Sequence, residues 1–178
     1  DRLNSIVWIM VSRHRLANTL TVVTVPQPST ETVTVMVLVP VGSRHEDPRI
    51  NGISHFLEHL MFKGTEQRPS TLELTKQLDA VGAEYNAYTS KDVTLYYIKV
   101  AASQLELALD LFSDMLFHSL FDTKEIDRER GVILEELNMY EDNPVMHVDT
   151  LFEMSVFGKT HPLGYDIGGK KKNIRQLP

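Results

Sequence analysis

Residues 52–62 constrain what this chain can become more than any other stretch; in one-letter code they are GISHFLEHLMF. In a helix, His55 and His59 would project only about 40° apart, because each residue turns the chain by about 100°. Two imidazoles at this spacing can bind a single divalent cation. Glu58 lies beside them and can reach a water on that cation without being a ligand itself. The spacing therefore predicts a metal site.

The rest of residues 52–62 is apolar nearly all the way round, so we expect this helix to be buried. Ionisable side chains on a buried helix are costly unless something compensates their charge, and a metal ion does so directly. The alternative is a hydrogen-bonded pair of core histidines. The additional glutamate between them favours the metal site.

The order His-x-x-Glu-His is the inverse of the commoner His-Glu-x-x-His and resembles the inverzincin signature. Together with its flanks, the run resembles the M16 family of zinc metallopeptidases, which includes pitrilysin, insulin-degrading enzyme and the mitochondrial processing peptidase. Within that family it most resembles the short branch that is similar to the processing peptidase. The resemblance runs from about residue 16 to the C-terminus and includes GSR at 42–44, FKGT at 62–65, NAYT at 86–89, ERGVILEE at 129–136, DNP at 142–144 and HPLG at 161–164.

Length and composition narrow the function classes. A chain of 178 residues is long enough for one domain with a real core. Its net charge of −6 provides no basic surface for nucleic acid. Because there is no cysteine, a zinc ion would be held by histidine and carboxylate ligands alone.

Residues 1–10 do not match the family, and we expect a non-native or disordered extension there, with an extra edge strand as the alternative. Their apolar run is too short to span a membrane, and no secretion or transit signal is evident. Residues 11–178 are expected to form one M16-like half-domain. We expect a cytoplasmic protein that acts on neither membranes nor nucleic acid.

Hydrophobic periodicity and turn residues predict the order of elements. We expect a β-rich opening with a turn near Asn18 at 16–25, followed by strands at 32–41, 83–89 and 93–100, of which the strand at 32–41 is central in its sheet. We expect helices at 52–62, 71–81, 103–116, 122–140 and 145–157. Asn51, Ser70, Ser103 and Asp122 are the expected N-caps. The fold class is α+β: a mainly antiparallel sheet with helices packed on one side.

The helix predicted at 122–140 carries the third ligand. Glu129 and Glu136 fall about 20° apart on its apolar face, which also carries Val132, Ile133, Leu137, Met139 and Tyr140. The other side carries Arg130, Gly131, Glu135 and Asn138, with Glu135 about 120° from Glu129 and pointing toward solvent. A buried carboxylate needs a partner, and the resemblance also implies that Glu136 is the distal zinc ligand. Glu129 is assigned to the catalytic residues: it supports His55 or His59 or relays protons, unless it forms a salt bridge with a buried arginine.

The predicted chemistry is peptide hydrolysis. Zinc held by two imidazoles and one carboxylate lowers the pKa of its water to about 7, and Glu58 accepts that water's proton and later passes it to the leaving amine. The resemblance implies that Asn86 and Ala87 lie on an edge strand to which an extended peptide adds. Ala87 would act through its backbone and Asn86 through a hydrogen bond near the scissile peptide.

The chain departs from the family in its length. Family members combine two or more related half-domains around the substrate, whereas this chain matches roughly one. We therefore expect a zinc endopeptidase module that requires a second half-domain, a partner subunit or self-association. The alternative is a non-catalytic, zinc-binding assembly subunit, and the intact Glu58 argues against it.

Overall fold

The computed structural model describes residues 10–177, and the chain divides into two units, Asp1–Thr32 and Val33–Pro178. In the first unit, β1 (Ser12–Arg15) and β2 (Thr21–Thr24) pair antiparallel, with Ser12 opposite Thr24. The turn near Asn18 forms as predicted, but the first strand of this hairpin lies before residue 16, so the β-rich opening predicted at 16–25 starts too late. The extension predicted at residues 1–10 lies almost entirely outside the described residues.

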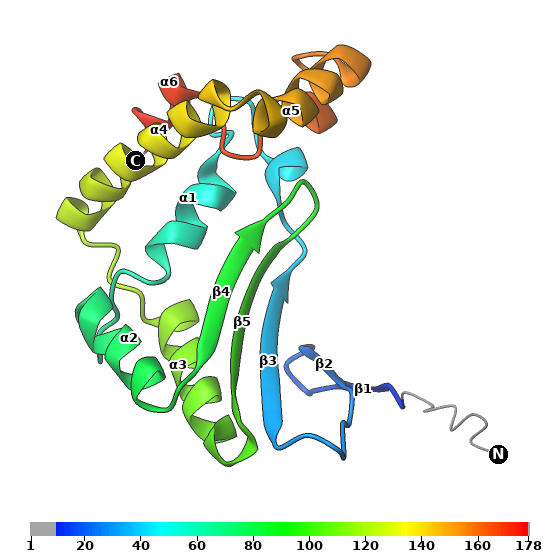
Figure 1. Cartoon of the computed structure of the whole chain (residues 1–178), viewed down its shortest axis with the longest axis vertical. Helices are drawn as coiled ribbons and strands as arrows, with labels where there is room; N and C mark the ends of the chain where they lie inside the picture. The colour runs from blue at the N-terminus through cyan, green and yellow to red at the C-terminus, as the bar shows by residue number, and fades with distance from the viewer. Residues whose placement is uncertain (1–9, 178) are drawn as a thin grey trace. The chain divides into compact units, whose positions relative to one another are not determined.

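The second unit is built on a three-stranded sheet of order β3-β5-β4 (Figure 1). Its strands are β3 (Thr32–Val39), β4 (Glu84–Thr89) and β5 (Thr94–Ala101). β4 and β5 pair antiparallel from Glu84 opposite Lys99 to Thr89 opposite Thr94. The prediction of β3 as the central strand is wrong, because β5 holds that place. Alternate residues of β3, including Met36 and Leu38, are exposed. One face of this apolar strand is therefore exposed, and the strand is not buried on both faces.

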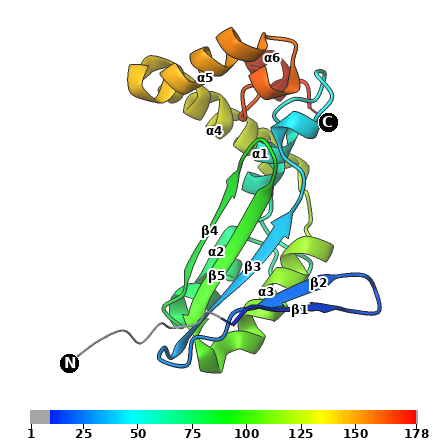
Figure 2. The same ribbon diagram turned by 90° about the vertical axis from the view of Figure 1, so that its right-hand side faces the viewer.

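Two helices, α2 (Thr71–Ala80) and α3 (Leu105–Phe117), lie on the same side of this sheet (Figures 1 and 2). The core between them is formed by Leu74, Leu78, Tyr96, Ile98, Val100, Ala108, Leu111, Phe112 and Met115. This arrangement confirms the α+β class and the antiparallel sheet.

The predicted caps of these helices are only partly right. The Ser70 side chain accepts a hydrogen bond from Glu73 N–H at the start of α2. Ser103, however, lies inside a 3₁₀ turn, Ala102–Gln104, and α3 begins after it without a side-chain cap. This turn connects β5 directly to α3, so the predicted capping box does not form there.

A second core cluster joins α1 (Ile53–Leu60), α4 (Thr123–Asp142) and the short helix α6 (Lys171–Ile174). Its buried members are Phe56, Leu60, Ile133, Leu137, Ile174 and Leu177. Figure 1 shows α1 between β4 and α4, and it contacts both. Its burial is incomplete, since Leu57 is exposed, contrary to the expectation of a helix buried all round.

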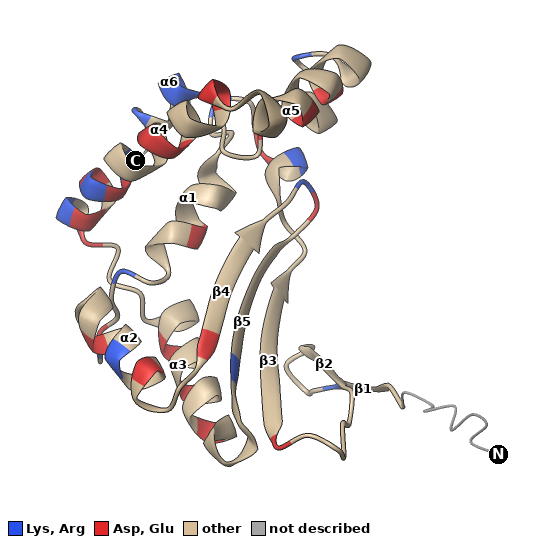
Figure 3. Cartoon of the chain, in the orientation of Figure 1, with Lys and Arg blue, Asp and Glu red and all other residues tan. Residues whose placement is uncertain are grey.

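The C-terminal part of the unit contains α5 (Pro144–Phe157), capped by the Asn143 side chain with Pro144 as first residue. No residue of α5 is fully buried. Both charge signs occur along α4, which Asp122 caps as predicted (Figure 3). None of the described helices is both long and apolar enough to cross a bilayer.

Candidate metal centre

The start of α1 is held by a carboxylate from the preceding loop. Glu46 accepts hydrogen bonds from Gly52 N–H at 2.7 Å and Ser54 N–H at 2.8 Å. The predicted N-cap, Asn51, is wrong: Gly52 occupies that position at φ 103°, a left-handed conformation that favours glycine. Asn51 is buried instead and donates to Glu46 and to the backbone oxygen of Asp166. This capping fixes where α1 begins and therefore where its histidines project.

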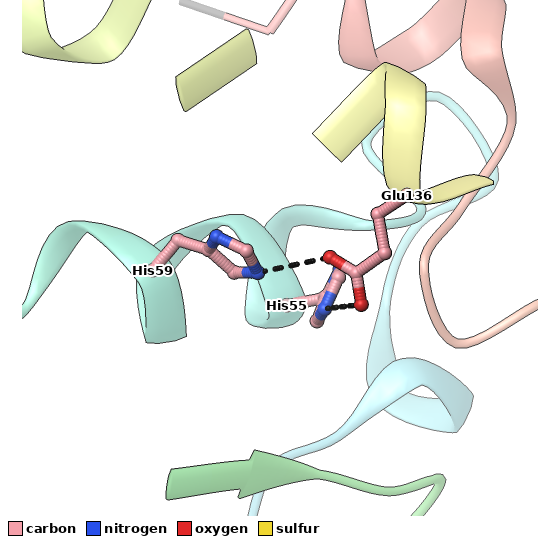
Figure 4. Close-up of side chains that lie close together, drawn as sticks. All are labelled: His55, His59 and Glu136. Atoms are coloured by element: carbon pink, nitrogen blue, oxygen red, sulfur yellow. Dashed lines mark ion pairs between the residues drawn. The ribbon is translucent and has the colours of Figure 1, made fainter. Parts of the chain in front are cut away.

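Two imidazoles from α1 and one carboxylate from α4 converge (Figure 4). His59 Nε2 lies 3.3 Å from Glu136 Oε2, and His55 Nε2 lies 3.8 Å from Glu136 Oε1. The three ligand atoms all lie within 4.8 Å of one another. Ligands of a tetrahedral zinc ion with bonds near 2.0–2.1 Å are about 3.3 Å apart. The donor set and its spacing therefore fit zinc.

The electrostatics of the three groups reflect their contacts. Burial, together with the neighbouring His59, lowers the pKa of His55. Burial alone would lower the pKa of His59 too, but hydrogen bonds with Glu136 and Glu129 outweigh it and raise that pKa. The hydrogen bond from His59 lowers the pKa of Glu136 against the effect of burial. The lowered pKa of Glu136 favours its ionised form, and that carboxylate attracts a cation to the site.

Glu129 and Glu136 contact different nitrogens of the His59 ring, Nδ1 and Nε2 respectively. Glu129 Oε2 is 3.2 Å from His59 Nδ1, and Glu129 Oε1 is 2.7 Å from Lys63 Nζ. The side chain is only 4% exposed, so these two partners account for its charge. Of the roles predicted for Glu129, the geometry matches support of His59, and the ion pair is with a lysine and not an arginine.

Glu58 points from α1 toward the sheet. Its Oε2 accepts a hydrogen bond from the Thr89 hydroxyl, with the two oxygens 2.5 Å apart. Thr89 is the last residue of β4, so the strand end fixes one oxygen of Glu58. Glu58 is not among the three clustered ligand atoms and is half-buried beside them.

A pocket of about 250 Å³ lies beside Glu58 and His59. Its other lining residues are Phe62, Lys63, Asn86 and Ala87. Asn86 and Ala87 belong to β4, which among the described strands pairs only with β5 and so forms an edge of the sheet. The Asn86 side-chain oxygen accepts a hydrogen bond from Ala87 N–H at 2.8 Å.

The burial of residues along α4 agrees only in part with the face predicted from the sequence. Glu129 is buried, Glu136 is half-buried, and Glu135 is exposed with Asn138 donating to it. Two residues expected on the buried face, Val132 and Met139, are exposed.

The other departure on α4 is Arg130, which was expected toward solvent. It packs over the Phe56 ring and donates to the backbone oxygens of Ile174 and Leu177. The buried face is therefore rotated toward Arg130, and the two glutamates lie at its edge.

Sequence reasoning missed three contributors to this site: Glu46, Lys63 and Thr89. Lys63 follows His59 by four residues, but its contact with Glu129 joins separate elements and has no signal in the sequence. Glu46 reaches Gly52 and Ser54 from the preceding loop, whose course no helix or strand pattern fixes, and Thr89 reaches Glu58 from a separate strand.

Comparison with known proteins places this geometry in a family. The family model described as insulinase (peptidase family M16) matches residues 21–169. The chain belongs to the M16 peptidase family. The resemblance seen in the sequence motifs is thereby confirmed.

Similar M16 proteins include two curated bacterial relatives. The chain is 42% identical over 165 residues to the uncharacterized zinc protease YmxG of Bacillus subtilis, covering 93% of this chain and 40% of that protein. It is 43% identical over 167 residues to the uncharacterized zinc protease SCO5738 of Streptomyces coelicolor, covering 94% of this chain and 36% of that protein. The chain thus spans about two fifths of the length of these relatives.

Solved structures show the same fold. A protease from Helicobacter pylori superposes with a TM-score of 0.85 and 31% identity, covering 96% of this chain and 41% of that one. Pitrilysin superposes with a TM-score of 0.81 and 26% identity, covering 97% of this chain and 18% of that one. The α+β architecture is therefore that of M16 peptidases.

Proposed function

We propose that this chain is a zinc-dependent endopeptidase module that cleaves peptides bound in an extended conformation. The observation that carries the proposal is the convergence of His55, His59 and Glu136 with Glu58 beside them and an open strand edge alongside. The names of the bacterial relatives as zinc proteases support the same chemistry.

In this proposal His55, His59 and Glu136 hold the metal. When bound, zinc would polarise the peptide carbonyl and lower the pKa of the attacking water. Glu58 accepts a proton from that water and later donates it to the leaving amine. Because Thr89 occupies Oε2 of Glu58, Oε1 is the oxygen free to exchange the proton. Glu129 receives the hydrogen bond of His59 Nδ1 and so leaves Nε2 free for the metal.

The substrate would lie along β4. An edge strand offers unpaired backbone groups to an extended peptide, which then adds as a further strand. Ala87 would contribute its backbone groups and Asn86 its side chain, and the hydrogen bond between Ala87 N–H and Asn86 Oδ1 would give way to bonds with the peptide. A peptide bound in this way would lie beside the residues that would cleave it.

A second half-domain, partner subunit or second copy would complete the substrate chamber. This part of the proposal is supported by the relatives, of which the matched region makes up only 40% and 36%.

The test measures zinc content and peptide cleavage together. Zinc content after dialysis should approach one ion per chain. An unstructured peptide should be cleaved when a second M16 half-domain is added, cleavage should stop with a chelator, and zinc should restore it. A chain that binds no zinc, or cleavage that survives chelation, would contradict the proposal. Zinc binding without cleavage by any assembled form would indicate a non-catalytic subunit.

A further inference from the structure

Lys63 is connected to the candidate metal site through a buried carboxylate. It lies three residues beyond Leu60, the last residue of α1, and its ammonium is 2.7 Å from Glu129 Oε1. The second oxygen of that carboxylate, Oε2, is 3.2 Å from His59 Nδ1. Lys63 also lines the pocket beside Glu58, Asn86 and Ala87. The contacts run from this pocket through Lys63 and Glu129 to His59.

The Glu129 carboxylate needs both of these partners. A glutamate's last torsion has a broad, roughly two-fold preference, so its own stereochemistry does not fix where the oxygens point. At 4% exposure, solvent contributes little to holding it. Lys63 fixes Oε1, and Oε2 then faces His59 Nδ1. An imidazole that donates from Nδ1 presents Nε2 unprotonated, which is the nitrogen facing Glu136.

We propose that Lys63 is a positioning residue for the metal site, acting through Glu129 on His59. This inference rests on the proposed function, since it takes His59 Nε2 to be a zinc ligand. The Lys63 ammonium pairs with Glu129 and not with any of the three candidate ligands, His55, His59 and Glu136. Its effect on metal binding is therefore indirect.

The sign of the effect separates positioning from charge alone. If Lys63 acted only as a nearby positive charge, its removal would strengthen zinc binding, because like charges repel. If it orients Glu129, its removal weakens zinc binding, as loss of a residue that orients a ligand typically costs about 10–100-fold in metal affinity. The two roles predict opposite changes.

The experiment measures the zinc dissociation constant by competition with a chromophoric chelator. Lys63→Met should weaken zinc binding by about tenfold or more. Lys63→Arg should restore most of the affinity, because a guanidinium also donates a charge-assisted hydrogen bond to a carboxylate. Lys76→Met, which removes an exposed lysine of α2, is the matched control and should change nothing.

A double-mutant cycle tests the route through Glu129 and covers a variant that folds poorly. In a Glu129→Gln background the buried group is neutral and needs no counter-charge, so Lys63→Met should have little further effect on zinc affinity. Circular dichroism confirms that each variant is folded before titration. Unchanged or tighter zinc binding by Lys63→Met, or an equal loss in the Glu129→Gln background, would overturn the inference. A wild-type chain that bound no zinc would overturn the proposed function itself, which is a different result.

Discussion

Glu58 is the residue whose role is most sharply separated from metal binding. Its oxygen is hydrogen-bonded to Thr89 and does not belong to the three-atom ligand cluster. Glu58→Gln keeps the shape of the side chain but removes the base. We expect zinc content to stay unchanged while cleavage by the assembled enzyme falls by about 100-fold or more. Loss of zinc together with activity would show that Glu58 is a ligand.

Glu136 and its neighbour Glu135 form a matched pair on α4. Glu136 lies within 3.3 Å of His59 Nε2, whereas Glu135 is exposed and contacts only Asn138 among described hydrogen-bond partners. Glu136→Gln should weaken zinc binding strongly, because a neutral amide is a poor ligand and the site loses a negative charge. Glu135→Gln should leave zinc affinity and stability nearly unchanged. Zinc content after dialysis against a mild chelator measures both, and the reverse order would refute the assignment.

At the scale of elements, α1 depends on the loop that precedes it. The helix is eight residues long, and Glu46 satisfies two of its first backbone N–H groups. Helices this short are not stable by themselves, so tertiary contacts such as this cap decide their position. The histidines can converge on Glu136 only while α1 starts at its present residue.

Glu46→Ala should therefore destabilise the fold by about 0.5–2 kcal/mol, the range found for lost N-caps. It should also weaken zinc binding, because the first turn of α1 would no longer be held in one position. Asp47→Ala is the control: Asp47 is exposed, and its side-chain bonds are to Arg49. Denaturant unfolding and zinc titration of both variants measure the effects. Equal effects of the two changes would show that Glu46 has no special part in holding α1.

The order of elements around the site followed from local patterns. The helix cap at Ser70, the strands at 84–89 and 94–101, and the long helix after Asp122 all formed where the sequence predicts them. Each depends on residues within a few positions of one another. The N-caps predicted at Asn51 and Ser103 do not form. Gly52 is the N-cap of α1 instead, and Ser103 lies within the 3₁₀ turn that precedes α3.

At the scale of the whole molecule, α5 leaves a row of apolar side chains uncovered. Val145, Val148, Phe152 and Val156 recur at helical spacing and are all more than half exposed. Exposed apolar surface of this kind promotes association. We expect the isolated chain to self-associate as its concentration rises, and a demonstrably monomeric sample to cleave peptide weakly or not at all.

Light scattering across a concentration series, with peptide cleavage measured on the same samples, tests this. Phe152→Glu should reduce self-association, whereas Gln176→Glu adds the same charge at an exposed polar position outside α5 and should not. Efficient cleavage by a monomer would contradict the expectation that a second half is required.

The sequence by itself determined the chemistry that this chain can offer. The spacing of His55, Glu58 and His59 on one short helix is a local property, fixed by 100° per residue, and the phase that puts Glu129 and Glu136 on one side of α4 is local as well. The motifs around them indicated the family that the comparison then confirmed.

Only the tertiary structure decided how these groups meet. Glu136 follows His59 by 77 residues in the sequence, yet the two side chains are 3.3 Å apart. They meet because α1 and α4 pack around Phe56, Ile133 and Leu137. The contacts of Thr89 with Glu58 and of Lys63 with Glu129 likewise join separate elements. No local pattern encodes such contacts, since they depend on the relative placement of packed elements, which burial of the whole apolar surface determines.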